Sequence, residues 1–173
     1  MAVDASPIDL LVKTATVDLL REYNLAVAPA SDCGALLKVP PTSLAGTVDF
    51  YGDGMNGRLV LVVPRAAVQA TSESHGVPAH AELDWVRELT GQLMGRIKRR
   101  FARYGKHIRV GLPSSTLAQS TVRQLAQTAE HRGYTFRSLK GEVHVALVGG
   151  CDPNLIDYTR VAGSYEEDEV ILF

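Results

Sequence analysis

The sequence predicts an α+β fold in which an N-terminal helix and one long helix pack on a mostly antiparallel sheet. Three observations lead to this fold class. Two pairs of strand patterns are each joined by a short turn that contains glycine, as in β-hairpins. One helical pattern, at residues 78–106, is longer than any other. Strands and helices do not alternate strictly, so a parallel sheet built from βαβ units is not expected.

The first half of the chain predicts one helix and one hairpin. Residues 7–23 repeat apolar side chains at helical spacing, and Pro7 suits the first turn. Residues 24–41 are rich in proline and form a long connection, with one short strand near 35–39. Strands at 42–51 and 57–63 flank a Gly-rich turn and make the hairpin. Because the second strand reads GRLVLVV, we expect it in the centre of the sheet, covered on both faces.

The middle of the chain predicts a short helix, the long helix and a short strand. Pro64 ends the preceding strand and opens a helix that runs to about residue 70, before a polar loop. Gly105 ends the long helix. Residues 108–112 then form a strand that Pro113 closes, and the next residues are expected to be a loop.

The last part predicts a helix and a second hairpin. The helix spans residues 120–132, between a Ser120 cap and a terminating glycine at 133. The hairpin has strands at 134–139 and 142–148. An acidic run at 166–169 then leads into the apolar residues 170–173, which form an edge strand or a docking tail.

Composition limits the function classes. A chain of 173 residues can form a single domain with a substantial core, which we place at residues 7–150, followed by an extension at 151–173. The net charge of -1 gives no electrostatic basis for binding nucleic acid or an anionic membrane. Cys33 and Cys151 lack metal-ligand spacing and suggest a reducing compartment. With no apolar run of about 18 residues and no signal-peptide pattern, we expect a soluble cytoplasmic protein.

The long helix has two distinct sides at 3.6 residues per turn. One side is apolar and is expected to face the core: Val86, Leu89, Leu93, Met94, Ile97, Phe101 and Tyr104. The opposite side carries polar residues and glycines: Asp84, Glu88, Gly91, Gln92, Gly95 and Arg99. A glycine inside a helix costs about 1 kcal/mol relative to alanine. The two glycines therefore suggest that another backbone or side chain approaches this side closely.

The run ELTGQLMGRIK at residues 88–98 resembles the signature helix of the CheC/CheX family of chemotaxis phosphatases. The family pattern is approximately E-x-x-N-x-x-x-G, with a lysine behind it. Glu88 occupies the acid position, Gly95 the glycine position and Lys98 the trailing lysine, whereas Gly91 stands where the family has asparagine. The resemblance extends over residues 7–150 and includes a Gly-rich hairpin before the helix and a Gly-x-Pro strand end after it. One copy of the motif makes the chain most similar to single-motif, CheX-like proteins.

The resemblance implies a CheX-like fold and a partner, the phosphorylated receiver domain of a CheY-type response regulator. It implies no cofactor on this chain, because the Mg²⁺ belongs to the receiver. In the family, the acid engages the receiver's active-site lysine and the asparagine orients the attacking water. By position, Asp84, Gly91, Gly95, Lys98 and Arg99 are candidate partner contacts. The resemblance also implies a homodimer that forms through the sheets.

The missing asparagine leaves three functions open. The first is a receiver phosphatase that uses Glu88, with Gln92 replacing the asparagine. Gln92 is one residue further along the helix, rotated by about 100°. The second is a catalytically inactive domain that binds a receiver or another signalling protein. The third is an oligomerisation module without a receiver partner.

Two other clusters have simpler interpretations. The cations of the last turns match the general preference for positive charge at a helix C-terminus; they are Arg96, Lys98, Arg99, Arg100, Arg103 and Lys106. His75 and His80, with Glu82 and Asp84, are the nearest approach to a metal site, but their spacing matches no metal motif. Neither cluster indicates a nucleic-acid or metal function.

Overall fold

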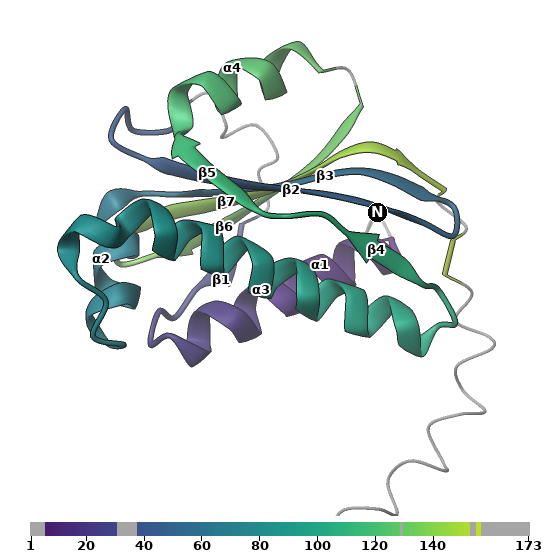
Figure 1. Cartoon of the computed structure of the whole chain (residues 1–173), viewed down its shortest axis with the longest axis horizontal. Coiled ribbons are helices and arrows are strands. Elements are labelled where there is room, and N and C mark those ends of the chain that lie inside the picture. Colours follow the sequence, from purple (N-terminus) through teal and green to yellow (C-terminus); the bar gives the residue numbers. More distant parts are fainter. Residues whose placement is uncertain (1–5, 31–37, 129, 153–154, 157–173) are drawn as a thin grey trace, which may run out of the picture.

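The computed structural model describes residues 6–30, 38–128, 130–152 and 155–156. These residues form one sheet with helices on both faces (Figure 1). The strands are β1 (Ala28–Pro29), β2 (Leu44–Gly52), β3 (Met55–Val63), β4 (Ile108–Val110), β5 (Ser114–Leu117), β6 (His131–Ser138) and β7 (Gly141–Cys151). The helices are α1 (Pro7–Glu22), α2 (Arg65–Glu73), α3 (Glu82–Arg103) and α4 (Ala118–Gln127), and a 3₁₀ turn (Ala79–Ala81) precedes α3.

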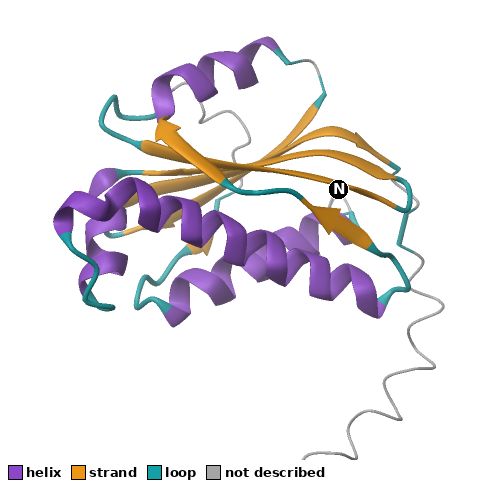
Figure 2. Cartoon of the chain, in the orientation of Figure 1, coloured by secondary structure: helices purple, strands orange, loops and turns teal. Residues whose placement is uncertain are grey.

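The sheet runs in the order β1-β6-β7-β3-β2-β4. Along the same edge of β2, β4 pairs with its last residues and β5 pairs with its first residues. Every pairing is antiparallel. Figure 2 shows α1, α2 and α3 on one face of the sheet and α4 on the other. The predicted α+β class, with a long helix and an N-terminal helix on a mostly antiparallel sheet, is confirmed.

The central strand is β3, between β7 and β2, as the sequence predicts. Leu59, Leu61 and Val63 face the large core beneath α1, α2 and α3. Val60 and Val62 face a smaller core on the opposite side of the sheet, which Ala118 and Leu125 of α4 share. The continuous apolar pattern therefore reflects burial on both faces.

The long helix crosses β2 in direct contact with its backbone. A Cβ atom on Gly46 would lie 1.8 Å from Oγ1 of Thr90, so only glycine fits at this point of β2. The Thr90 hydroxyl in turn donates to the carbonyl oxygen of Val86 at 2.7 Å. The predicted core side is confirmed, because Leu89, Leu93, Ile97 and Phe101 are fully buried. This contact fixes which side of α3 faces away from the sheet.

Three expectations for residues 113–133 are wrong. The predicted loop after Pro113 contains β5, which pairs with the first half of β2. The predicted helix at 120–132 begins earlier, at Ala118, whose N–H donates to the carbonyl oxygen of Ser43 at 2.9 Å. It ends at Gln127, because β6 already pairs with β7 from His131 onward.

Other expectations fall wholly or partly outside the described residues. They are the strand near 35–39, the acidic run at 166–169, the apolar end at 170–173 and the environment of Cys33. The short strand that the structure does show in the long connection is β1, which pairs with β6. Within the described ranges, none of the helices has the length and apolar character needed to cross a bilayer.

Candidate functional site

The candidate site is the side of α3 that faces away from the sheet, between α1 and the edge formed by β4 and β5. Glu88 is exposed there, one turn before Gly91 and two turns before Gly95, which are both partly buried. Residues three, four and seven positions apart lie on one side of a helix. The chain therefore places the acid and both glycines of the predicted motif in one accessible row, as the sequence predicts.

Gln92 lies at the contact between α3 and α1. It begins a row of three α3 residues that bind the end of α1: Gln92 contacts the capping residue Tyr23, Arg96 pairs with Glu22 and Arg100 pairs with Asp18. The Arg100–Asp18 pair spans 2.5 Å between Nη2 and Oδ2. Two of the six predicted basic side chains are therefore committed to holding α1 against α3.

The Gln92 amide links a buried tyrosine to the exposed acid. The hydroxyl of Tyr23 donates to Oε1 of Gln92 at 2.6 Å. The Gln92 Nε2 donates to Oε1 of Glu88 at 2.8 Å. The structure therefore brings the two predicted catalytic residues together. It also shows that each end of the Gln92 amide already has a protein partner.

The two glycines have different surroundings. A Cβ atom on Gly91 would lie 3.4 Å from Cγ of Pro113, in the segment between β4 and β5. Apart from the neighbouring backbone of α3 and its two chain neighbours, a Cβ atom on Gly95 would meet no atom of the described residues within 4 Å. Packing inside the described part of the chain therefore does not require glycine at position 95. Position 91 faces Pro113, so the Gly-x-Pro segment lies beside the position of the missing asparagine.

The remaining candidate contacts surround this row. Asp84 pairs with Arg87 on its own helix at 2.8 Å, between Oδ1 and Nη2. Lys98 and Arg99 are exposed, and within the part of the chain that the structure describes neither has an ion-pair partner. Lys98 and Arg99 follow Glu88 by ten and eleven residues on α3, which places these two cations about 15 Å further along the helix axis than the carboxylate.

The histidine-containing cluster does not form a metal site. His75 packs against the rings of Tyr23 and Trp85, with ring centroids 4.4 Å and 5.9 Å away. Glu82 is buried and pairs with Arg65 at 2.9 Å, between Oε2 and Nε. No three His, Cys, Asp or Glu side chains gather with metal-binding geometry among the described residues.

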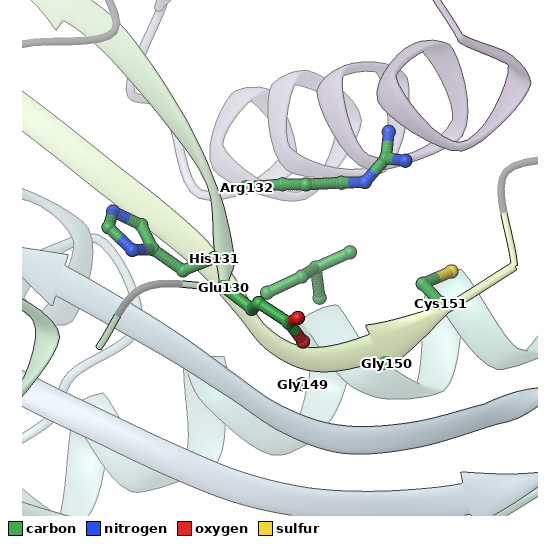
Figure 3. Close-up of a pocket in the computed structure, with 7 residues that line it drawn as sticks. Glu130, His131, Arg132, Gly149, Gly150 and Cys151 are labelled. Atoms are coloured by element: carbon green, nitrogen blue, oxygen red, sulfur yellow. The ribbon is translucent and has the colours of Figure 1, made fainter.

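A pocket of about 340 Å³ opens between β6 and β7, away from α3 (Figure 3). Arg132 extends from it toward α1 and donates to Oδ1 of Asp9 at 3.3 Å. The Tyr134 hydroxyl donates to the same oxygen at 2.7 Å, and burial, together with this bond, raises the pKa of Tyr134. Burial also raises the pKa of the Cys151 thiol. These polar groups join β6 to α1 and indicate a structural role.

A second hollow of about 460 Å³ lies at the N-terminal end of α3. Its walls include three leucines, Leu44, Leu83 and Leu117, and the Arg65–Glu82 ion pair lies among them. The charged groups of this hollow satisfy each other. Thr42 and His80 are its remaining polar lining residues, and no second acid or base beside His80 forms a catalytic pair there among the described residues, so the α3 row remains the candidate site.

Sequence reasoning missed Tyr23 and Pro113 as members of the site. Tyr23 follows α1 without a distinctive local pattern, and its contact with Gln92 spans 69 positions. Pro113 was interpreted only as a strand end. A helical projection of α3 alone cannot reveal either neighbour, because it contains no information on which elements pack beside the helix.

Comparison with solved structures identifies the fold as that of CheX and CheC-like chemotaxis proteins. The chemotaxis protein CheX from Vibrio vulnificus matches with a TM-score of 0.66 and 13% identity, over 85% of this chain and 99% of that one. CheX from Desulfovibrio desulfuricans matches with a TM-score of 0.61 and 16% identity, over 81% and 97%. A CheX–CheY–BeF₃–Mg²⁺ complex from Borrelia burgdorferi matches with a TM-score of 0.60 and 11% identity, over 85% and 99%.

At the sequence level, the chain matches no protein-family model, and no curated protein is similar enough to count as a relative. The TM-scores show a shared fold, although the sequence identities are all below 20%. They do not transfer an activity, because one fold can carry many functions.

Proposed function

We propose that this domain binds the phosphorylated receiver domain of a CheY-type response regulator through the exposed row of α3. The supporting observation is the row itself: Glu88 is held by Gln92, and Gly95 has no packing reason within the described chain to lack a side chain. A structure of the same fold was solved as a CheX–CheY–BeF₃–Mg²⁺ complex. A glycine row beside a fixed carboxylate allows a partner to approach the helix backbone closely.

Each candidate residue has a chemical role in this proposal. Glu88 accepts a hydrogen bond from a cationic side chain of the receiver, since a carboxylate favours a charged donor. Lys98 and Arg99 interact with acidic groups around the phosphorylated site of the receiver. Asp84 lies at the edge of the contact and is already paired with Arg87. The Mg²⁺ ion is carried by the receiver, and this chain supplies no ligand for it.

The geometry favours binding without hydrolysis. In-line attack on an acyl phosphate requires a group that orients water beside the phosphorus. Gly91 has no side chain to do this. The Gln92 amide is engaged by Tyr23 on one side and by Glu88 on the other. Receiver binding by a catalytically weak or inactive domain is therefore the function that the site supports best.

Phosphatase activity through Gln92 is the second candidate. One observation favours it: Gln92 is hydrogen-bonded to Glu88, so an amide and an acid lie together on the proposed contact. An amide nitrogen carries two hydrogens. One of them binds Glu88, which leaves a second hydrogen for a water molecule.

The test is the decay of a phosphorylated receiver from the same organism, with no addition, with wild type and with the Gly91→Asn variant. We expect no acceleration by wild type and clear acceleration by the variant. The new Cβ would lie at van der Waals distance from Pro113, so the helix should accept it. Acceleration by wild type would favour phosphatase activity through Gln92. If both proteins leave the decay unchanged and neither binds the receiver, the proposed function is wrong.

We also propose a homodimer that forms through the sheets, as the family resemblance implies. The sheet edge at β5 supports this proposal, because Leu117 on that strand is 60% exposed. Sedimentation at several concentrations measures the dimer directly, and a monomer at all concentrations would exclude it. A dimer that binds no receiver would favour the oligomerisation module.

A further inference from the structure

Tyr23, Gln92 and Glu88 form a directed chain of hydrogen bonds that ends on Glu88 and joins a tyrosine far away in the sequence to two residues of α3. Its orientation follows from chemistry. The Glu88 carboxylate, when ionised, can only accept, so the Gln92 group that faces it must be the amide nitrogen. The Gln92 carbonyl oxygen then faces Tyr23, whose hydroxyl must donate. Each group in the chain therefore has one defined role.

Tyr23 is itself fixed in place. Its ring is buried, with 6% of its surface exposed, and lies edge-on to Trp85 with centroids 5.0 Å apart. The Trp85 Nε1 donates to Oγ1 of Thr71 at 3.0 Å, which ties that ring to α2. His75 also packs on the tyrosine, with centroids 4.4 Å apart, and stacks on Trp85 at 5.9 Å, so the three rings form one cluster. The hydroxyl at the start of the chain is thus held by the packing of α1, α2 and α3.

We infer that Tyr23 is a positioning residue which, through Gln92, holds the Glu88 carboxylate in the orientation that the receiver contacts. This inference rests on the proposed function and adds the residue that directly follows α1 to a site built on α3. One Glu88 oxygen is occupied by Gln92, and the other has no partner among the described residues. The chain of hydrogen bonds from Tyr23 through Gln92 to Glu88, here called the relay, presents that second oxygen to a donor on the partner.

The expected size of the effect follows from the freedom that the relay removes. Glu88 is exposed, and without Gln92 its side chain would lose rotamer freedom only when the partner binds. Immobilising one such side chain typically weakens binding by a factor between about two and ten. Removal of the Tyr23 hydroxyl should therefore weaken receiver binding within this range, without changing any residue on the contact itself.

The experiment compares receiver affinity for wild type, Tyr23→Phe, Glu88→Ala and the double variant. Phenylalanine keeps the ring and its packing and removes only the donor. We expect Tyr23→Phe to weaken binding between twofold and tenfold in the wild-type background, and to have no effect once Glu88 is alanine. Tyr51→Phe, on the exposed face of β2, is the matched control and should leave affinity unchanged. Equal loss in both backgrounds would show a merely structural role and overturn the inference.

A second measurement needs no receiver. The side-chain amide of Gln92 should show slowed hydrogen exchange and a distinct NMR resonance in wild type, and Tyr23→Phe should accelerate the exchange and shift the resonance. An unchanged Gln92 amide would overturn the relay even if a receiver binds. If Tyr23→Phe changes the exchange and the resonance of the Gln92 amide but wild type binds no receiver, the hydrogen bond between Tyr23 and Gln92 is upheld. That result would overturn the proposed function and the partner role with it.

Discussion

At the scale of single residues, the two helical glycines of α3 differ from the glycine of β2 in what surrounds them. Gly46 is required by contact, since its Cβ would overlap Thr90. Gly95 has open space where a side chain would be. A glycine that the fold does not need, in the middle of a helix, lowers stability by about 1 kcal/mol relative to alanine. The proposed function accounts for its presence, because a docked receiver would need close access to the helix backbone at this position.

This difference gives a prediction for Gly95→Ala. The variant should unfold at higher urea concentration, with a free energy of unfolding about 1 kcal/mol above wild type, because the new methyl group meets nothing and the helix gains propensity. Receiver binding should weaken at the same time. Urea denaturation and an affinity measurement check the two effects. The control is Gly46→Ala, which should be destabilised; a destabilised Gly95→Ala would contradict the open space seen at this position.

The sequence predicted the environment of single residues correctly where that environment depends only on their position around one helix. The core side of α3 and the exposure of Glu88 follow from the period of 3.6 residues alone. The environment of Gln92 did not follow, because its position is decided by where α1 crosses α3. A helical projection gives the direction of a side chain and carries no information on the neighbouring element.

At the scale of elements, α1 is held against α3 by ion pairs at the rim of their apolar contact. Asp18 and Arg100 lie 2.5 Å apart, and their side chains are 40% and 21% exposed. Partly exposed pairs contribute little, typically below about 1 kcal/mol, because water screens the charges. These ion pairs therefore set the register of the two helices more than they stabilise the fold.

We predict a small coupling between Asp18 and Arg100. In a double-mutant cycle with Asp18→Asn and Arg100→Gln, the coupling free energy of unfolding should lie below about 1 kcal/mol and shrink as salt rises. Chemical denaturation at low and high ionic strength measures it. A coupling of several kcal/mol that persists at high salt would mean that the pair is effectively desolvated.

Element prediction from the sequence was accurate for elements with strong local patterns. Both hairpins and the helices α1 and α3 were predicted, because their periodicity and their turn residues lie within one segment. β5 was missed, since Ser114 and Ser115 have no strand pattern and are extended only because they pair with Thr47 and Gly46. Nonlocal pairing therefore explains the main errors in the predicted elements.

At the scale of the whole molecule, the sheet separates two cores of different size, and a buried histidine lies on the side with the smaller one. His144 pairs in register with Val62, on the face that points away from α1 and α3. Its Nδ1 lies 3.1 Å from Oγ1 of Thr135, and the ring is almost fully buried. Burial lowers the pKa of His144, and the negative charge of Glu142 opposes this shift only in part.

The lowered pKa predicts how global stability depends on pH. Between the folded and the unfolded pKa of His144, the unfolded chain binds more protons than the folded one, so stability falls with falling pH. The neutral ring gives its full contribution above the unfolded value of about 6.5, and the contribution declines as pH falls from there toward the folded pKa. The slope for one group cannot exceed about 1.4 kcal/mol per pH unit.

Urea denaturation at pH 7.5 and pH 5.5 measures this dependence. Wild type should lose more free energy of unfolding between the two pH values than His144→Gln, whose neutral amide can keep a hydrogen bond to Thr135. His80→Gln, at an exposed position before α3, controls for the loss of one histidine. If wild type and His144→Gln lose the same free energy, protonation of His144 does not oppose folding. The sensitivity to acid would then have to arise in other groups of the chain.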